Sequence, residues 1–173
     1  GKGIEINEPA FYKELNLQRQ RSKKSTKISS SVFAQSNVIK GIKSTNFVGY
    51  DKISSVSKIL QIIKGAKNVN KAKTGEGVEI ILDKTPLYAE SGGQAGDKGV
   101  ISKDKRAIFN VENTIKQDKI IIHSGKVVKG AFKIQDKTTA IIDNDFRKAV
   151  ARAHTACHML QAALREVLGK HVR

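Results

Sequence analysis

The sequence predicts an α+β protein with a small antiparallel β domain between two helices, and three observations support this. Residues 8–35 contain no glycine and a single proline. Residues 45–143 contain short runs of β-branched residues separated by turn residues. From residue 145 to 168, apolar residues recur every three or four positions, the period of an amphipathic helix. We therefore divide the chain into residues 1–44, 45–143 and 144–173.

The first element is a helix in which Pro9 suits the first turn. Phe11 and Leu15 form a brief apolar face, but residues 18–24 are polar on every side. A helix this polar usually contacts a partner outside its own domain. Either its basic side chains lie along phosphates, or the segment frays in solvent. A lysine- and serine-rich connection follows up to residue 43.

The β domain is predicted from six runs rich in β-branched residues and bounded by Gly, Asn, Asp and Lys. They are residues 47–50, 58–63, 78–82, 107–111, 120–123 and 138–142. Several short strands at close intervals favour an antiparallel barrel or a sandwich. Alternation is incomplete in residues 119–123, so the pattern does not decide which face of that strand is buried.

Residues 85–99 form an unusual segment of this domain, with four glycines within the eight residues 92–99. Glycine permits positive φ and lets a ligand approach the backbone. The segment is neither a phosphate-binding loop nor a dinucleotide-binding fingerprint. Composition alone favours an irregular turn that carries the hydrogen-bonding side chains of Glu90, Gln94 and Asp97.

The last element is the amphipathic helix, which Asp143 or Asp145 can cap at its start and a left-handed Gly169 at its end. Its notable feature is His154 and His158, which are four residues apart and therefore neighbours on one face. Two imidazoles at this spacing can bind one metal ion, although such pairs are more often solvated or hydrogen-bonded than bound to a metal.

Two neighbouring residues limit this metal hypothesis. The residue after His154 is Thr155, not the glutamate that supplies the base in H-E-x-x-H hydrolases, so an independent metalloprotease is disfavoured. Cys157 lies toward the apolar side of the helix, and we expect it to be a small buried side chain, not a third ligand.

The composition favours a nucleic-acid partner inside the cell. The chain has 32 Lys and Arg against 16 Asp and Glu, a net charge of +16, and such an excess favours a polyanion. One cysteine excludes an internal disulfide framework. No apolar run is long enough to span a bilayer and the first residues do not resemble a signal peptide, so we expect a cytoplasmic protein with no membrane partner.

Three segments together resemble the alanyl-tRNA synthetase family. Residues 88–97, YAESGGQAGD, are similar to the family's Y-A-E-S-G-G-Q-x-G-D stretch. Residues 152–165, RAHTACHMLQAALR, resemble its R-x-H-T-A-T-H-L-L-x-A-A-L-R helix, with Cys157 where the family usually has threonine. Residues 47–51, FVGYD, are similar to a third segment that precedes the barrel. The three occur in family order and cover roughly residues 45–173.

The resemblance implies part of a class II alanine–tRNA ligase: the end of the tRNA-recognition region, a translation-factor-like antiparallel β-barrel and the first helix of the editing domain. That domain hydrolyses tRNA wrongly charged with serine or glycine. His154 and His158 would be two of four Zn²⁺ ligands, the other two lying beyond Arg173, and Gln94 would act indirectly. The aminoacylation core, which uses ATP, Mg²⁺ and alanine, would precede Gly1. The candidate contacts to tRNA(Ala) are Arg19, Arg21, Lys23 and Lys24.

Two alternatives remain open at this point. One is a freestanding editing hydrolase with the same barrel and motif, which the long basic segment before residue 47 disfavours. The other is a non-catalytic RNA-binding module, whose affinity would fall steeply as salt rises. In the leading interpretation the isolated chain is catalytically inactive.

Overall fold

The computed structural model describes residues 38–39, 41–104, 106–169 and 171. These residues belong to one compact unit, which begins at Val38. The predicted N-terminal helix lies outside the described residues, and so do the candidate tRNA contacts Arg19, Arg21, Lys23 and Lys24.

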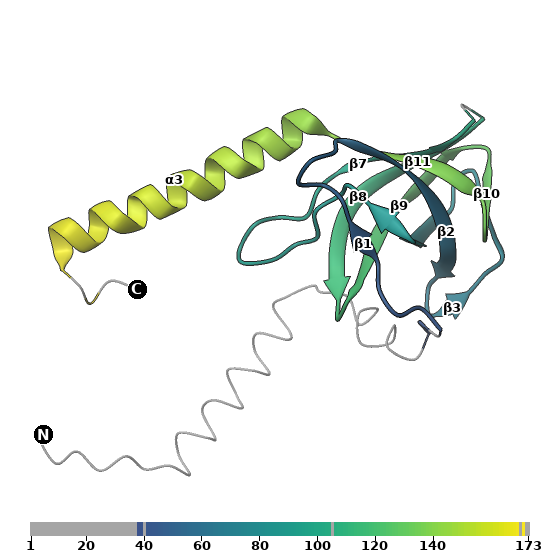
Figure 1. Cartoon of the computed structure of the whole chain (residues 1–173), viewed down its shortest axis with the longest axis horizontal. Coiled ribbons are helices and arrows are strands. Elements are labelled where there is room, and N and C mark those ends of the chain that lie inside the picture. The colour runs from purple at the N-terminus through teal and green to yellow at the C-terminus, as the bar shows by residue number, and fades with distance from the viewer. Residues whose placement is uncertain (1–37, 40, 105, 170, 172–173) are drawn as a thin grey trace, which may run out of the picture. The chain divides into compact units, whose positions relative to one another are not determined.

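The described residues form short strands followed by one long helix (Figure 1). The strands are β1 (Asn46–Phe47), β2 (Ser54–Lys64), β3 (Lys67–Asn68), β4 (Lys71–Lys73), β5 (Gly77–Leu82), β6 (Lys84–Thr85), β7 (Gly99–Lys103), β8 (Ala107–Gln117), β9 (Ile120–Lys129), β10 (Ala131–Lys133) and β11 (Lys137–Ile142). The helix, α3, spans Asn144–Leu168.

Six of the strands close into an antiparallel barrel. Their order is β11-β7-β8-β9-β5-β2, and β2 pairs again with β11, so the sheet has no open edge between them. β3 continues the sheet beside β2, while β1 with β6 and β4 with β10 form two separate two-stranded pairs. The predicted antiparallel barrel and C-terminal helix are confirmed.

The barrel interior is filled by alternate side chains of these strands. In β2, buried and exposed residues alternate from Ser54 to Ile59, as expected when one face of a strand is buried. The largest buried side chains of this inner cluster include Phe109 and Phe132, whose rings meet edge to face with centroids 6.4 Å apart. This geometry is favourable for aromatic pairs.

A second cluster explains why alternation fails in residues 120–123. Ile120 and Ile122 belong to a cluster separate from the barrel interior, and the partly buried Val38, Ile39 and Ile42 pack against it. Ile121 and His123 are also buried. Both faces of this strand are therefore buried, because the segment before the barrel covers the outer face.

The strand predictions differ from the structure in several respects. The strands β3, β4, β6 and β10, each of two or three residues, were not predicted. β7 was not predicted because it directly follows the glycine-rich segment, to which its first residue, Gly99, was assigned. Gly99 has a structural role, since a Cβ at this position would lie 2.2 Å from the Ile141 carbonyl oxygen in the neighbouring β11. The predicted strand at residues 47–50 is shorter in the structure, where β1 ends at Phe47 and a turn follows.

The helix begins and ends near the predicted residues. Asp143 is the N-cap, and its Oδ1 accepts the Phe146 backbone N–H at 2.9 Å. The helix ends at Leu168, and Gly169 follows with φ 107° and ψ 169°. The φ is positive, as glycine permits, but the predicted left-handed helical conformation is not adopted.

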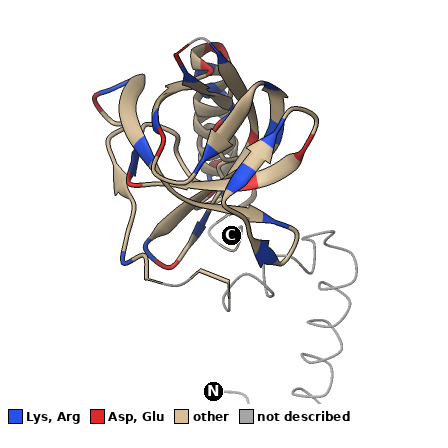
Figure 2. Ribbon diagram, turned by 90° about the vertical axis from the view of Figure 1, so that its right-hand side faces the viewer, with Lys and Arg blue, Asp and Glu red and all other residues tan. Residues whose placement is uncertain are grey.

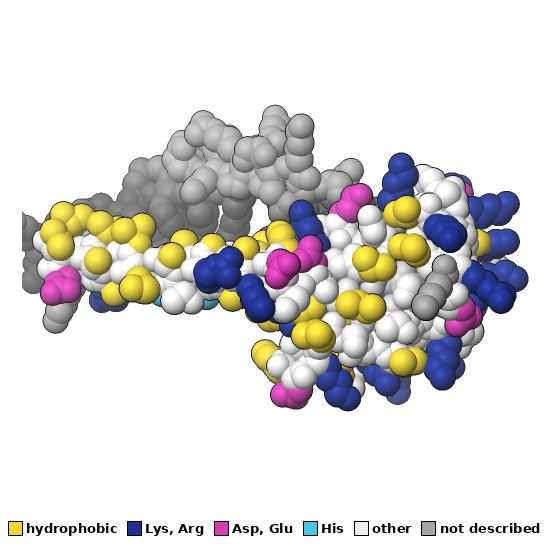
Figure 3. Space-filling model, turned by 90° about the horizontal axis from the view of Figure 1, so that it is seen from above, with side chains coloured by type: hydrophobic (Ala, Val, Ile, Leu, Met, Phe, Trp, Pro, Cys, Tyr) yellow, Lys and Arg dark blue, Asp and Glu magenta, His cyan; other side chains and the backbone are white. Residues whose placement is uncertain are grey.

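α3 contributes no buried residue to the described structure. Met159, Leu160, Val167 and Leu168 are exposed, and apolar side chains line its visible surface (Figure 3). No helix in the described part of the chain combines the length and apolar character that a membrane crossing needs.

Candidate metal centre beside a glycine turn

The two predicted metal ligands face each other on α3. His154 Nε2 and His158 Nε2 are 3.0 Å apart, and the ring centroids are separated by 4.6 Å. Two nitrogens that each bind zinc at 2.0–2.1 Å in a tetrahedral site are roughly 3.3 Å apart. The pair therefore fits two corners of a zinc site after a shift of a few tenths of an ångström. When no metal is bound, one ring can donate its N–H to the other.

The histidines line an open cavity of about 490 Å³ between α3 and the glycine-rich segment. The segment contributes Gly92, Gly93, Gln94 and Ala95, and the helix contributes Val150, Ala153, His154, Cys157, His158 and Gln161. The structure thus brings the predicted site residues Gln94, His154 and His158 to one cavity, although Gln94 lies 60 or more residues from the two histidines in the sequence.

The glycine-rich segment is an ordered tight turn and not the irregular loop that its composition favoured. Ser91 and Gln94 exchange backbone hydrogen bonds of 3.2 and 3.0 Å. Between them Gly92 and Gly93 have φ of 59° and 79°. Positive φ at both central positions is what a type I′ turn requires, and glycine adopts it without steric cost. The turn therefore presents the backbone of Gly92 and Gly93, which have no side chains, to the cavity beside α3.

Asp97 holds the end of this turn in the barrel. Its side chain is only 1% exposed, and its Oδ2 accepts the Tyr88 N–H at 2.7 Å. Its backbone N–H donates to the Tyr88 carbonyl at 2.8 Å, and its carbonyl accepts the Thr114 hydroxyl at 2.8 Å. The segment between Tyr88 and Asp97 is therefore closed at its base by hydrogen bonds.

Arg147, in the first turn of α3, connects the helix to that base. Its Nε donates to Asp97 Oδ2 at 3.0 Å, and its Nη2 forms a second contact with the same oxygen. Its Nη1 donates to the Gly49 carbonyl at 2.8 Å and its Nη2 to the Pro86 carbonyl at 2.7 Å. One guanidinium thus joins α3 to three segments of the barrel region, and it fixes where the helix starts relative to the glycine turn.

Sequence reasoning missed Arg147 and gave Asp97 no structural role. The partners of Arg147 are 50, 61 and 98 residues away, so no local pattern reveals them. The available signal was indirect: Asp97 is a carboxylate in an apolar and glycine-rich stretch, and such a group, if buried, needs a cationic partner.

The expectation that Cys157 is buried was wrong. Its thiol is free and exposed, and the residue lines the cavity beside the histidines. The reason is that α3 buries none of its residues, so its apolar side is open to solvent. Within the described part of the chain, no group of three or more His, Cys, Asp or Glu side chains could hold a metal. The histidine pair therefore offers two ligands.

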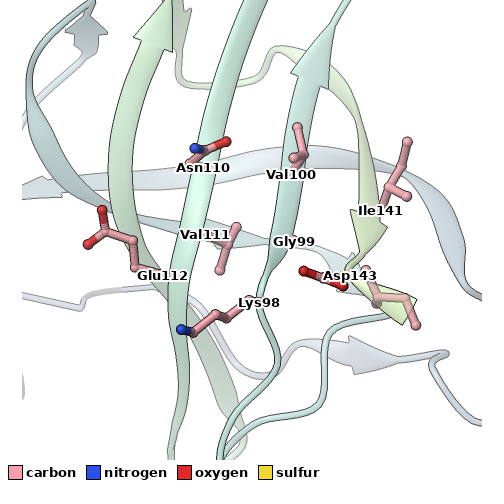
Figure 4. Close-up of a pocket in the computed structure, with 9 residues that line it drawn as sticks. Lys98, Gly99, Val100, Asn110, Val111, Glu112, Ile141 and Asp143 are labelled. Atoms are coloured by element: carbon pink, nitrogen blue, oxygen red, sulfur yellow. The ribbon is translucent and has the colours of Figure 1, made fainter. Parts of the chain in front are cut away.

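A second cavity, of about 660 Å³, lies on the outer surface of β7, β8 and β11 (Figure 4). It is lined by Val100, Val111 and Ile141 together with Lys98, Glu112 and Asp143. Lys98 also lies over the Phe146 ring, 4.9 Å from its centroid, and Asp143 caps α3. Two of its charged residues, Lys98 and Asp143, thus have structural partners, and we place the candidate site at the histidine cavity.

Comparison with known proteins gives a consistent result along the whole chain. Residues 1–146 match the family described as tRNA synthetases class II (A). The chain is 42% identical over 172 residues to the alanine–tRNA ligase of Thermoanaerobacter pseudethanolicus, covering 98% of this chain and 19% of that protein. It is 37% identical to the enzyme of Pelotomaculum thermopropionicum and 38% identical to that of Dehalococcoides mccartyi. Each of these alignments covers 99% of this chain and 20% of the relative. The chain thus spans about a fifth of the length of the curated relatives that it matches.

Proposed function

The chain belongs to the class II (A) tRNA synthetase family, as part of an alanine–tRNA ligase, and from this membership we propose that it serves tRNA binding and editing. In this proposal the whole protein attaches alanine to tRNA(Ala) in the cytoplasm with ATP and Mg²⁺. The present chain contributes to tRNA binding and to the hydrolysis of tRNA mischarged with serine or glycine. Residues 144–173 would begin the editing domain and residues 45–143 would form the barrel domain.

The observation that carries the editing proposal is the approach of two imidazole nitrogens to 3.0 Å beside the glycine turn. His154 and His158 would be two ligands of a zinc ion, and the family pattern supplies two more outside residues 1–173. When bound, the zinc would polarise an acyl ester or activate a water for its hydrolysis. The role of these two residues is to hold the metal at the cavity.

The remaining cavity residues have positioning roles in this proposal. The Gly92–Gly93 turn leaves room for the terminal nucleotide of tRNA to approach the backbone. Gln94 is half-buried at the cavity wall and can orient a substrate by hydrogen bonding. Arg147 and Asp97 act on neither substrate nor metal; they hold α3 so that the histidines face the turn.

The tRNA-binding part of the proposal rests on charge. A net charge of +16 favours a polyanionic partner. Arg19, Arg21, Lys23 and Lys24, which precede the described residues, remain the proposed phosphate contacts of the N-terminal segment. A non-catalytic RNA-binding module would share this property, so the metal site is the feature that separates the two functions.

A zinc titration tests the proposed site. We expect the chain to bind Zn²⁺ weakly, because two ligands leave the ion largely hydrated, and we expect His154→Ala and His158→Ala each to weaken binding by about tenfold or more. His171→Ala is the matched control, because His171 is also exposed and near the C-terminus but is not a member of the pair. Isothermal titration calorimetry measures the affinities.

The result separates the competing functions. If His154→Ala leaves a submicromolar zinc affinity intact, the assignment of the site is refuted. A longer chain that carries the family's second ligand pair should bind zinc far more tightly and lose that gain when either histidine is replaced. Unaltered zinc binding in those variants would leave an RNA-binding module as the better description.

A further inference from the structure

Two pairs of lysines lie directly opposite each other across strand pairs of the barrel region. In the register of β2 with β11, Lys58 is opposite Lys137. In the register of β4 with β10, Lys71 is opposite Lys133. All four are exposed, and residues directly opposite across antiparallel strands project from the same face.

The two pairs lie on the two sides of one turn, residues 134–136, which joins β10 to β11. On one side, the Ile134 N–H donates to the Asn70 carbonyl, the residue before Lys71, at 3.2 Å. On the other, the N–H of Ile59, the residue after Lys58, donates to the Asp136 carbonyl at 3.0 Å. We call Lys58, Lys71, Lys133 and Lys137 the lysine surface.

The lysine surface lies in a strongly basic region of the molecule. Figure 2 looks at the barrel from the side of β10 and shows Lys and Arg on several neighbouring strands and turns. Figure 3 shows their side chains gathered at the end of the barrel opposite α3.

Three acidic side chains lie near the lysine surface, and each accepts backbone N–H groups. Asp83 Oδ1 accepts the Lys58 N–H at 2.7 Å and the Lys84 N–H at 2.8 Å. Asp136 pairs with Lys103 at 2.5 Å and accepts the Lys133 backbone N–H at 2.8 Å. Glu76 pairs with Lys64 at 2.8 Å and accepts the Lys73 backbone N–H at 2.7 Å. Among the ion pairs of the described residues, none involves a lysine of this surface.

Like charges directly opposite on paired strands destabilise a sheet. This chain carries two such pairs, one on each side of one turn, and their ammonium groups form no ion pair among the described residues. A bound polyanion would convert the repulsion into attraction, because its charges would lie between and over the ammonium groups. The arrangement therefore points to a ligand with regularly spaced negative charges.

We propose that the lysine surface binds the sugar–phosphate backbone of double-stranded RNA. Lysines contact phosphates as point charges and carry no base specificity, so the contact would position the RNA without reading its sequence. This inference rests on the proposed RNA-binding function but not on the histidine pair. It adds a second contact area, on the barrel, to the basic segment at the N-terminus.

The test uses the full chain and a short RNA duplex of arbitrary sequence, followed by fluorescence anisotropy between about 50 and 200 mM salt. Lys133→Gln/Lys137→Gln removes one member of each opposed pair. We expect its affinity to fall about tenfold at the lower salt, and the slope of log affinity against log salt to become shallower by about 2. Its melting temperature should equal or exceed that of the unaltered chain, because the repulsion is relieved.

Lys116→Gln/Lys119→Gln is the matched control, since it removes the same charge from exposed positions at the β8–β9 turn. This turn is at the other end of the β8–β9 hairpin from Lys129, which is followed by β10. The control should retain most of the affinity. Lys58→Gln/Lys71→Gln changes the opposite members of the same pairs and should reproduce the loss.

The outcomes distinguish failure of the lysine surface from failure of the proposed RNA-binding function. Equal losses in the control and in the surface variants would overturn the lysine surface and leave only general attraction by net charge. If the surface variants bind RNA as the unaltered chain does but lose binding to phosphatidylserine vesicles, the RNA proposal is overturned in favour of a membrane surface as the partner. If the unaltered chain does not bind the duplex at all, both the lysine surface and the proposed RNA-binding function are wrong.

Discussion

At the scale of single residues, His123 shows how the barrel accommodates a polar side chain in its interior. The side chain is fully buried, with its Nδ1 2.9 Å from the Ile80 carbonyl oxygen and its Nε2 2.8 Å from the Thr85 hydroxyl. Burial lowers the pKa of His123 to about 4, because the charged ring would lose its hydration. A neutral ring whose Nδ1 donates to Ile80 then accepts from Thr85 at Nε2.

This burial predicts a pH dependence of stability. Below about pH 6.5 the unfolded chain binds a proton at His123 that the folded chain excludes until about pH 4, so stability falls as the pH falls through this range. We expect a loss of about 2 kcal/mol between about pH 7.5 and about pH 5 from this group. His123→Gln should lose that part of the dependence, measured as the difference between the urea unfolding curves of the two proteins.

Other groups titrate in the same range, so only the difference between the two proteins counts. His171→Ala serves as the control, because it removes a histidine that is exposed in the folded chain. An identical pH dependence in His123→Gln and the unaltered chain would show that the buried ring does not resist protonation.

At the scale of elements, α3 depends on its first turn for its attachment to the barrel. None of its residues is buried, and such a helix gains little from packing. Arg147 is the only residue of α3 that forms an ion pair among the described residues, and its partner Asp97 is 1% exposed. The orientation of the histidine cavity thus depends mainly on the Arg147 guanidinium and the three segments that it contacts, with a further contact between Lys98 and the Phe146 ring.

Replacing this guanidinium should release the helix. Arg147→Ala leaves the buried Asp97 carboxylate without its cation, and we expect a loss of about 3 kcal/mol in the free energy of unfolding. Amide hydrogen exchange in α3 should become faster than in the unaltered chain. Arg147→Lys should restore little, because an ammonium cannot reach three segments as the planar guanidinium does.

Arg152→Ala is the control for this change, since Arg152 is exposed on the same helix and makes no ion pair in the described structure. It should alter stability by less than about 0.5 kcal/mol. Equal exchange rates in α3 of Arg147→Ala and Arg152→Ala would mean that Arg147 does not hold the helix.

At the scale of the whole molecule, the closed barrel and the exposed helix α3 differ in how complete they are within the described residues. The barrel has its own core and no unpaired edge between its six strands. The cavity beside α3 has the two histidines proposed as metal ligands, and among the described residues no group of three or more His, Cys, Asp or Glu side chains could hold a metal. A metal held by two imidazoles is readily lost. Under the proposed function, the chain would therefore bind RNA but lack a complete site for hydrolysis.

This difference predicts that the chain binds tRNA without editing it. Serine-charged tRNA(Ala) incubated with the chain and excess zinc should lose its serine at the background rate, measured by gel separation of charged and uncharged tRNA. A complete alanine–tRNA ligase is the positive control. Turnover above background would place the hydrolytic site elsewhere in this chain.

Local signals in the sequence were sufficient for much of the fold. Runs of β-branched residues located most of the barrel strands, and helical periodicity with Asp143 as N-cap located α3. The position of His154 four residues before His158 was enough to predict that the rings meet. The recognisable motifs around Gln94 and the histidines identified the family. Each of these predictions depends on residues that are close together in the sequence.

Contacts between distant residues were decided only by the tertiary structure. Closure of β2 against β11, the pairing of Arg147 with Asp97 and the opposition of the lysine pairs each join residues about 50 or more positions apart. The same holds for the exposure of Cys157, which depends on whether anything packs against α3. The periodicity of apolar residues predicts which face of a helix or strand a side chain occupies. Whether that side chain is buried, forms an ion pair or lies opposite a like charge depends on residues that are distant in the sequence and are brought next to it by folding.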